Sequence, residues 1–109
     1  MHFALALAVS CVALLACGAR VHAGESAAID VLMQQFAFAP ATITVPAGAT
    51  VTWTNRDTVP HTVTSTDGGF DSGPVEPGKS FQWKAQKPAT YHCLYHPSMT
   101  GSIVLAPAR

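Results

Sequence analysis

Charged side chains are scarce in this sequence, and neither sign is in excess. Asp, Glu, Lys and Arg make up 11% of its 109 residues, and six acidic residues balance six basic ones. A nucleic-acid-binding surface or a polybasic membrane contact needs clustered cations, so we expect no nucleic-acid partner. Disordered chains combine high charge with low hydrophobicity, whereas 49% of the residues here are hydrophobic. The length and composition therefore predict one small folded domain.

Two further absences narrow the function and the fold. No paired carboxylates and no Ser/His/Asp arrangement stand out, so we predict that the protein is not an enzyme. Beyond residue 23, no stretch of ten residues shows the 3.6-residue hydrophobic period of an amphipathic helix. The main part of the chain is therefore expected to be all-β.

The N-terminal segment has the features of an export signal. Residues 3–17 are apolar except for Ser10, and this run is shorter than the roughly 20 residues that a membrane-spanning helix needs. A hydrophobic run of this length, followed by the small residue Ala23, is typical of a signal peptide and its cleavage site. We therefore predict a cleaved signal over residues 1–23, a domain over residues 24–109, no membrane span and a periplasmic location.

The same segment offers an alternative and bears on the cysteines. Leu14-Leu15-Ala16-Cys17 resembles a bacterial lipoprotein box, so lipidation at Cys17 is the alternative to ordinary cleavage. Removal of the predicted signal would take away Cys11 and Cys17 and leave Cys93 as the one cysteine. One cysteine cannot form an internal disulfide. A free thiol in an oxidising compartment indicates a reactive role or a metal.

Short alternations of apolar and polar residues run through the rest of the chain. Val51 and Trp53 alternate with threonines, which is the period of a half-buried strand. Proline and glycine separate the alternating segments, as at Pro46-Ala47-Gly48 and Glu76-Pro77-Gly78-Lys79. The pattern predicts eight strands, over residues 29–33, 36–38, 42–45, 50–55, 61–65, 81–84, 90–94 and 102–105. Short strands with frequent turns predict a sandwich of two sheets.

Side chains that can bind a metal lie close to the ends of predicted strands. Cys93, His96 and Met99 follow one another at intervals of three residues, and His61 lies upstream beside another strand. Thiolate, imidazole and thioether form a soft donor set that suits copper in both of its oxidation states. Two histidines and a cysteine in a plane, with a long axial methionine, are typical of an electron-transfer copper site. His92 points to the opposite face of its strand and is not a predicted ligand.

Seven short motifs surround these residues: Phe36-x-Phe38-x-Pro40, Pro46-Ala47-Gly48, Val51-Thr52-Trp53-Thr54-Asn55, Pro60-His61, Tyr91-His92-Cys93, His96-Pro97 and Met99-x-Gly101. Together they resemble the cupredoxins, the small blue copper proteins, over nearly the whole chain from Phe36 to Leu105. The spacing Cys-x₂-His-x₂-Met is similar to the short ligand loop of the amicyanins.

The resemblance implies an eight-stranded Greek-key β-sandwich with one type 1 copper per chain, bound by His61, Cys93, His96 and Met99. It also implies a periplasmic protein, expected to be a monomer, that shuttles single electrons. Its transient partners would be redox proteins, namely a donor dehydrogenase and an acceptor cytochrome or oxidase. A periplasmic module that binds or delivers copper without a dedicated electron-transfer partner is the alternative. An open, enzyme-like copper site is a third hypothesis, which applies if Met99 does not coordinate.

Two further expectations concern residues beside the predicted ligands. The residue after the first histidine ligand is commonly asparagine in this family, where it helps to tie the two ligand loops together. Here that residue is Thr62, whose hydroxyl we expect to replace part of the link. An apolar docking patch is expected around His96, formed by Leu94, Tyr95, Pro97 and Pro60.

Overall fold

Eight strands make up the regular structure of residues 27–107, the part of the chain that the computed structural model describes. They are β1 (Ala28–Gln34), β2 (Ala37–Ala39), β3 (Thr42–Val45), β4 (Ala49–Asn55), β5 (Thr64–Ser65), β6 (Ser80–Ala85), β7 (Ala89–His92) and β8 (Thr100–Leu105). Within this region, no helix is long and apolar enough to cross a membrane. The predicted signal over residues 1–23 and the alternative lipidation site at Cys17 lie outside the described residues.

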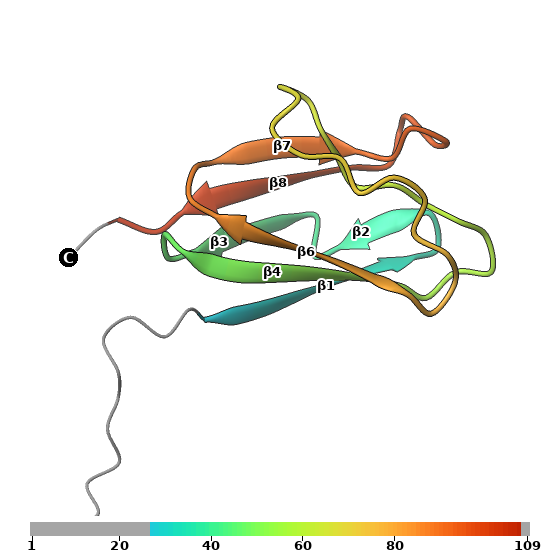
Figure 1. The fold of residues 1–109 in the computed structure, drawn as a ribbon, viewed down its shortest axis with the longest axis horizontal. Coiled ribbons are helices and arrows are strands. Elements are labelled where there is room, and N and C mark those ends of the chain that lie inside the picture. Colours follow the sequence, from blue (N-terminus) through green and yellow to red (C-terminus); the bar gives the residue numbers. More distant parts are fainter. Residues whose placement is uncertain (1–26, 108–109) are drawn as a thin grey trace, which may run out of the picture.

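The strands form two four-stranded sheets that pack face to face (Figure 1). One sheet has the order β2-β1-β4-β6 and the other has the order β3-β8-β7-β5. The pairs β1/β4 and β3/β8 are parallel, and the remaining pairs are antiparallel. Strands β2 and β3 are neighbours along the chain but lie in different sheets, so the chain crosses between the layers. The prediction of an eight-stranded Greek-key β-sandwich is confirmed.

The alternation that predicted the strands also fills the core between the sheets. In β4, Val51, Trp53 and Asn55 are fully buried, whereas the threonines between them are half-buried. This follows from the geometry of a strand, in which successive side chains point to opposite faces. The Trp53 ring meets Tyr91 of β7 edge-on, with 5.3 Å between the ring centroids. Because β4 and β7 belong to different sheets, this contact joins the two layers.

Two predicted strands near the ligands differ from the observed ones. The strand predicted over residues 36–38 begins one residue later, because Phe36 lies in the turn between β1 and β2 with a positive φ of 56°. The strand predicted over residues 61–65 is reduced to the two residues of β5. His61 itself forms only an isolated bridge to Val75.

The third difference lies at the end of β7. The strand predicted over residues 90–94 ends at His92, so Cys93 is the first residue beyond it. The Cys93 N–H donates to the Met99 carbonyl oxygen at 3.0 Å instead of continuing the sheet ladder. The chain therefore leaves the sheet at the residue that carries the thiol.

Candidate metal centre

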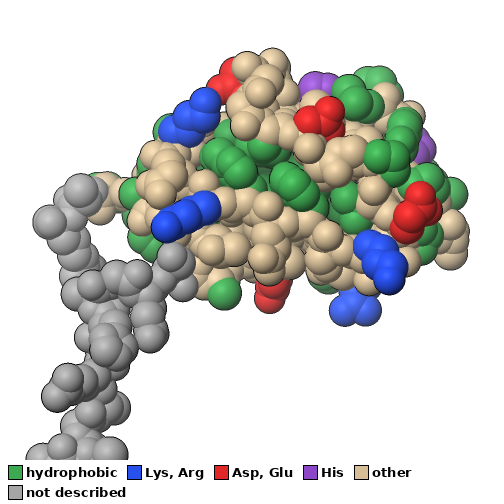
Figure 2. All heavy atoms as spheres, viewed as in Figure 1, with side chains coloured by type: hydrophobic (Ala, Val, Ile, Leu, Met, Phe, Trp, Pro, Cys, Tyr) green, Lys and Arg blue, Asp and Glu red, His purple; other side chains and the backbone are tan. Residues whose placement is uncertain are grey.

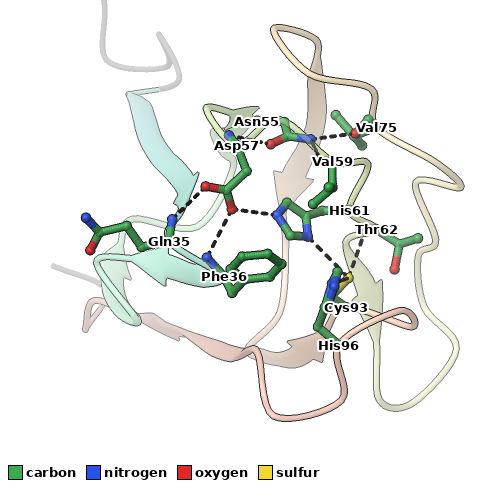
Figure 3. A network of polar contacts seen from close by, with 10 residues as sticks. All are labelled: Gln35, Phe36, Asn55, Asp57, Val59, His61, Thr62, Val75, Cys93 and His96. Carbon is green, nitrogen blue, oxygen red and sulfur yellow. Dashed lines mark hydrogen bonds and ion pairs between the residues drawn. The ribbon is translucent and has the colours of Figure 1, made fainter.

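Three of the four predicted ligands come together at one end of the sandwich. Cys93, His61 and His96 each offer one ligand atom, and these atoms all lie within 4.8 Å of one another. Cys93 Sγ is 3.7 Å from His61 Nδ1 and 3.6 Å from His96 Nδ1. Figure 3 shows the three side chains close together. Cys93 and His61 are fully buried, and His96 is half-buried. The site therefore has one edge toward solvent, at His96.

The donor atoms fit a small soft cation. Metal–sulfur and metal–nitrogen bonds of about 2.3 and 2.0 Å that meet at about 120° place sulfur and nitrogen roughly 3.7 Å apart. The distances from Cys93 Sγ to the two imidazole nitrogens, 3.7 and 3.6 Å, agree with this value. Both histidines present Nδ1 to the sulfur, which leaves each Nε2 free for another partner. A thiolate with two imidazoles in this arrangement suits copper.

The loop from Cys93 to Met99 closes on itself. The Met99 N–H donates to the His96 carbonyl oxygen at 2.8 Å, and the Cys93 N–H donates to the Met99 carbonyl oxygen. Met99 is buried and belongs to the same core cluster as Cys93. The fold therefore brings the thioether-bearing residue to the buried end of the loop.

Asp57 is a neighbour of the site that the sequence analysis missed. Its Oδ2 lies 2.7 Å from His61 Nε2, and its side chain is 13% exposed. Burial alone would raise the pKa of the Asp57 carboxyl. Hydrogen bonds from the Phe36 N–H, the His61 ring and the Gln35 N–H outweigh burial and hold that pKa below its ordinary value. Asp57 is thus an anionic acceptor that fixes the His61 ring from the side away from Cys93.

Thr62 joins the two loops that carry the predicted ligands. Its hydroxyl oxygen accepts the Leu94 N–H at 2.8 Å, so the expected loop link through this hydroxyl is confirmed. Its backbone N–H points at Cys93 Sγ, with 3.3 Å between nitrogen and sulfur. This N–H is therefore a hydrogen-bond donor to the sulfur, and it comes from the loop that also carries His61.

Asn55 fixes the segment that leads to His61. Its side-chain nitrogen donates to the carbonyl oxygens of Val59 and Val75, both at 2.8 Å. Its side-chain oxygen accepts the backbone N–H of Asp57 at 2.9 Å. A fully buried amide with three hydrogen bonds holds a loop in one conformation. The segment between β4 and β5 is therefore shaped by this side chain rather than by a sheet ladder.

Several apolar residues next to the predicted ligands, in the chain or in space, are exposed. Leu94 is 52% exposed and Tyr95 is 49% exposed, and Pro60 and Pro97 are also exposed. Phe36, which the sequence analysis did not include, is 53% exposed. We call Phe36, Pro60, Leu94, Tyr95 and Pro97 the apolar rim. In the right half of Figure 2, histidine side chains reach the surface beside hydrophobic ones.

His92 lies apart from the donor set. It is half-buried in β7 and pairs with Thr64 of β5 in the sheet. The group of metal-binding side chains found among the described residues does not contain it. Its position agrees with the strand alternation, which directs it away from the side that Cys93 takes.

The fold and the donor set define a small β-sandwich protein with one mononuclear site for a soft metal. A family model described as a cupredoxin-like domain matches residues 5–105. Amicyanin-alpha of Methylorubrum extorquens is 34% identical, over 96% of this chain and 97% of its own length. The chain therefore belongs to the cupredoxin family, and within that family it is similar to amicyanin. The family and the donor arrangement support one type 1 copper as the cofactor.

Solved structures agree with this assignment. A novel purple cupredoxin from Nitrosopumilus maritimus is 26% identical with a TM-score of 0.66, over 72% of this chain and 99% of that one. A mutant of amicyanin in the Cu(I) form is 26% identical with a TM-score of 0.68, over 72% and 82% of the two chains. A copper-containing nitrite reductase from Thermus scotoductus SA-01 has a TM-score of 0.67 at 23% identity. The match covers only 23% of the reductase, so it shows a shared fold alone.

Proposed function

We propose that this protein is a periplasmic carrier of single electrons that uses one type 1 copper. In this proposal, His61, Cys93, His96 and Met99 would hold the copper. The observation that carries the proposal is the triangle of one sulfur and two Nδ1 atoms, whose S···N separations of 3.7 and 3.6 Å fit a trigonal metal. Copper in such a set alternates between Cu(I) and Cu(II).

The protein's own residues supply a rigid and dry site. Cys93 and His61 are fully buried, which keeps water away from the sulfur and from one imidazole. Thr62 ties the two ligand loops together, and Asp57 holds the outer nitrogen of His61. Ligands fixed in this way need little movement when the charge at the centre changes.

The exposed edge at His96 supports exchange of electrons with a partner. The half-buried imidazole connects the buried sulfur with the surface, and residues of the apolar rim lie next to it. Electron-transfer encounters are small and transient, so a patch of this kind is enough for docking. In the proposal, the partners are redox proteins: a donor dehydrogenase and an acceptor cytochrome or oxidase.

Export to the periplasm is the remaining part of the proposal. It is supported by the apolar run over residues 3–17 and by the small residue Ala23 at the proposed cleavage site. The domain would then extend over residues 24–109. The single remaining cysteine would be occupied by the metal, which accounts for a free thiol in an oxidising compartment.

Burial of the site favours electron transfer over copper delivery or substrate turnover. A delivery module exposes its ligands so that an acceptor can reach the metal, and a catalytic metal keeps an open coordination position. Here the thiol and one imidazole are fully buried, and the rim offers only the edge of the second imidazole. We therefore propose that the metal stays in place while the electron moves.

Spectroscopy of the purified protein with Cu(II) tests the proposal. We expect one copper per chain and an intense visible band from charge transfer between Cys93 and copper. Cys93→Ser should abolish the band. Reduced protein mixed with an oxidised c-type cytochrome should become blue while it retains its copper. A colourless Cu(II) complex would contradict the type 1 assignment, and loss of copper to the acceptor without electron transfer would favour delivery.

A further inference from the structure

The turn between β1 and β2 has an unusual backbone for its sequence. Gln35 and Phe36 are its two central residues, and their φ angles are +54° and +56°. A two-residue hairpin with positive φ at both positions is a type I′ turn, for which Asn-Gly and similar pairs are preferred. Residues other than glycine rarely adopt this left-handed backbone conformation. Strained residues persist only where their surroundings hold them.

A single carboxylate holds this turn. Asp57 Oδ1 accepts the Gln35 N–H at 2.7 Å, and Asp57 Oδ2 accepts the Phe36 N–H at 3.0 Å. Two successive N–H groups that converge on one anion form a nest, an arrangement that favours negative charge. The same Oδ2 lies 2.7 Å from His61 Nε2. Figure 3 shows the carboxylate between the turn and the imidazole.

The turn places an aromatic ring against both imidazoles. The Phe36 centroid is 5.7 Å from that of His61 and 4.8 Å from that of His96, and both contacts are edge-on. Edge-on packing at these distances is favourable for aromatic rings. Phe36 is 53% exposed, so burial in the core does not account for its position. Its place is set by the left-handed turn, and the turn is set by Asp57.

We propose that Asp57 is a positioning residue of the metal centre that fixes two elements at once. It orients the His61 ring by hydrogen bonding, and it holds the Gln35–Phe36 turn so that Phe36 covers the edge shared by His61 and His96. This inference rests on the proposed function of the site. Without the carboxylate, the turn relaxes, Phe36 leaves the imidazoles and both rings gain freedom.

Substitution of Asp57 tests the proposal in the full-length protein, with and without copper. Asp57→Ala removes all three interactions, whereas Asp57→Asn keeps one oxygen acceptor and is expected to act in the same direction but less strongly. Asp67→Ala is the matched control. The Asp67 carboxylate accepts hydrogen bonds from the Gly69 N–H and from Lys87 Nζ, neither of which belongs to a histidine. Loss of groups that orient metal ligands typically weakens metal affinity by about 10- to 100-fold.

Three measurements give the expected result. In metal-free protein, nuclear Overhauser contacts between the Phe36 and His96 rings should be present in the wild type and in Asp67→Ala, and absent in Asp57→Ala. With copper, Asp57→Ala should change the electron paramagnetic resonance spectrum and the reduction potential, and chelator competition should show at least about 10-fold weaker copper binding. Phe36→Ala should reproduce part of the spectral change, because the His61–Asp57 contact persists.

A double variant separates the turn from the histidine. Gln35→Gly removes the steric cost of positive φ, so Asp57→Ala/Gln35→Gly should regain thermal stability. It should not regain the wild-type spectrum, because His61 still lacks its acceptor. If Asp57→Ala fails to fold, Asp57→Asn provides the ring contacts and the copper measurements, and Phe36→Ala provides the copper measurements. Ring contacts and copper properties that match those of Asp67→Ala would overturn the proposal. The ring contacts in metal-free protein do not depend on electron transfer, so this result is distinct from failure of the proposed function.

Discussion

Thr62 and Leu94, which are 32 positions apart in the chain, are joined by a hydrogen bond from the Leu94 N–H to the Thr62 hydroxyl at 2.8 Å. Thr62 follows His61 and Leu94 follows Cys93, so this one bond fixes the spacing of two predicted ligands. The contact also explains how threonine serves at a position where the family commonly has asparagine. The link needs an acceptor for one backbone N–H, and a hydroxyl oxygen provides it.

Loss of this hydroxyl should loosen the two ligand loops. Thr62→Val keeps the shape of the side chain but leaves the part-buried Leu94 N–H without its acceptor. We expect the free energy of unfolding of the metal-free protein to fall by about 1 kcal/mol, the net contribution of a typical hydrogen bond, because the Leu94 N–H is only part-buried. Urea denaturation measures the change. Thr62→Ser keeps the hydroxyl and should lie near the wild type, and equal stability of the valine and serine variants would contradict the role of the bond.

Replacement of Met99 tests its proposed role as a copper ligand. A thioether favours Cu(I), whereas the amide oxygen of glutamine is a harder donor that favours Cu(II). Met99→Gln should therefore lower the midpoint potential and leave copper bound, as measured by voltammetry and metal analysis. Met33→Leu is the control, because Met33 is equally buried but lies in β1, outside the ligand loop. An unchanged potential and spectrum in Met99→Gln would exclude Met99 as a ligand.

Gly101 should not tolerate a side chain. A Cβ atom at this position would lie 2.5 Å from Cζ and from Oη of Tyr91 and 2.6 Å from Cε2. The Tyr91 ring is buried in the core and cannot move aside without disturbing Trp53. Gly101→Ala should therefore reduce the free energy of unfolding by about 1–3 kcal/mol, the typical cost of overpacking.

The next residue in β8 provides the control for the Gly101 substitution. Ser102→Ala changes a partly exposed side chain that bonds the Thr42 hydroxyl, and it should cost less than Gly101→Ala. Thermal unfolding of both variants measures the difference. Equal melting temperatures for Gly101→Ala and the wild type would show that the Tyr91 ring has room to shift.

Tyr91 should make the protein less stable at alkaline pH. Burial raises the pKa of its phenol above the ordinary value of about 10. Above about pH 10, the unfolded chain loses this proton while the folded protein keeps it. The free energy of unfolding therefore falls as pH rises toward the pKa of the folded state. The contribution of the Tyr91 phenol to stability is fully present below about pH 10.

Tyr91→Phe should remove this part of the alkaline destabilisation. Among the described residues the Tyr91 hydroxyl has no hydrogen-bond partner, so its loss near pH 7 should cost less than about 1 kcal/mol or stabilise the fold. Urea denaturation between pH 7 and pH 11 measures how steeply the free energy of unfolding falls with pH. Tyr95→Phe, at an exposed tyrosine, is the matched control. If the free energy of unfolding of Tyr91→Phe falls with pH as steeply as that of the wild type, other groups cause the alkaline destabilisation.

The sequence alone was enough to predict the strands and the ligand loop. The period-two alternation of Val51 and Trp53 is local, because a strand sends successive side chains to opposite faces whatever it packs against. The spacing of Cys93, His96 and Met99 is also local, since all three belong to one short loop. Both patterns can therefore be recognised in the sequence without knowledge of the fold. They account for the all-β sandwich and for the donor set, with His61 added from its place in the family motif.

The surroundings of the ligands were decided by the tertiary structure. Asp57 and Phe36 are far apart in the chain. The pair Gln35-Phe36 also lacks the Asn-Gly sequence that is typical of the type I′ turn that it forms. The turn exists because a carboxylate from another loop accepts both of its N–H groups. The reduction of the predicted strand over residues 61–65 to β5 has the same kind of cause. The Asn55 side-chain amide donates to the carbonyl oxygens of Val59 and Val75 and so shapes the segment before His61. Long-range hydrogen bonds between side chain and backbone depend on which loops the sheets bring together, and this is not encoded in local periodicity.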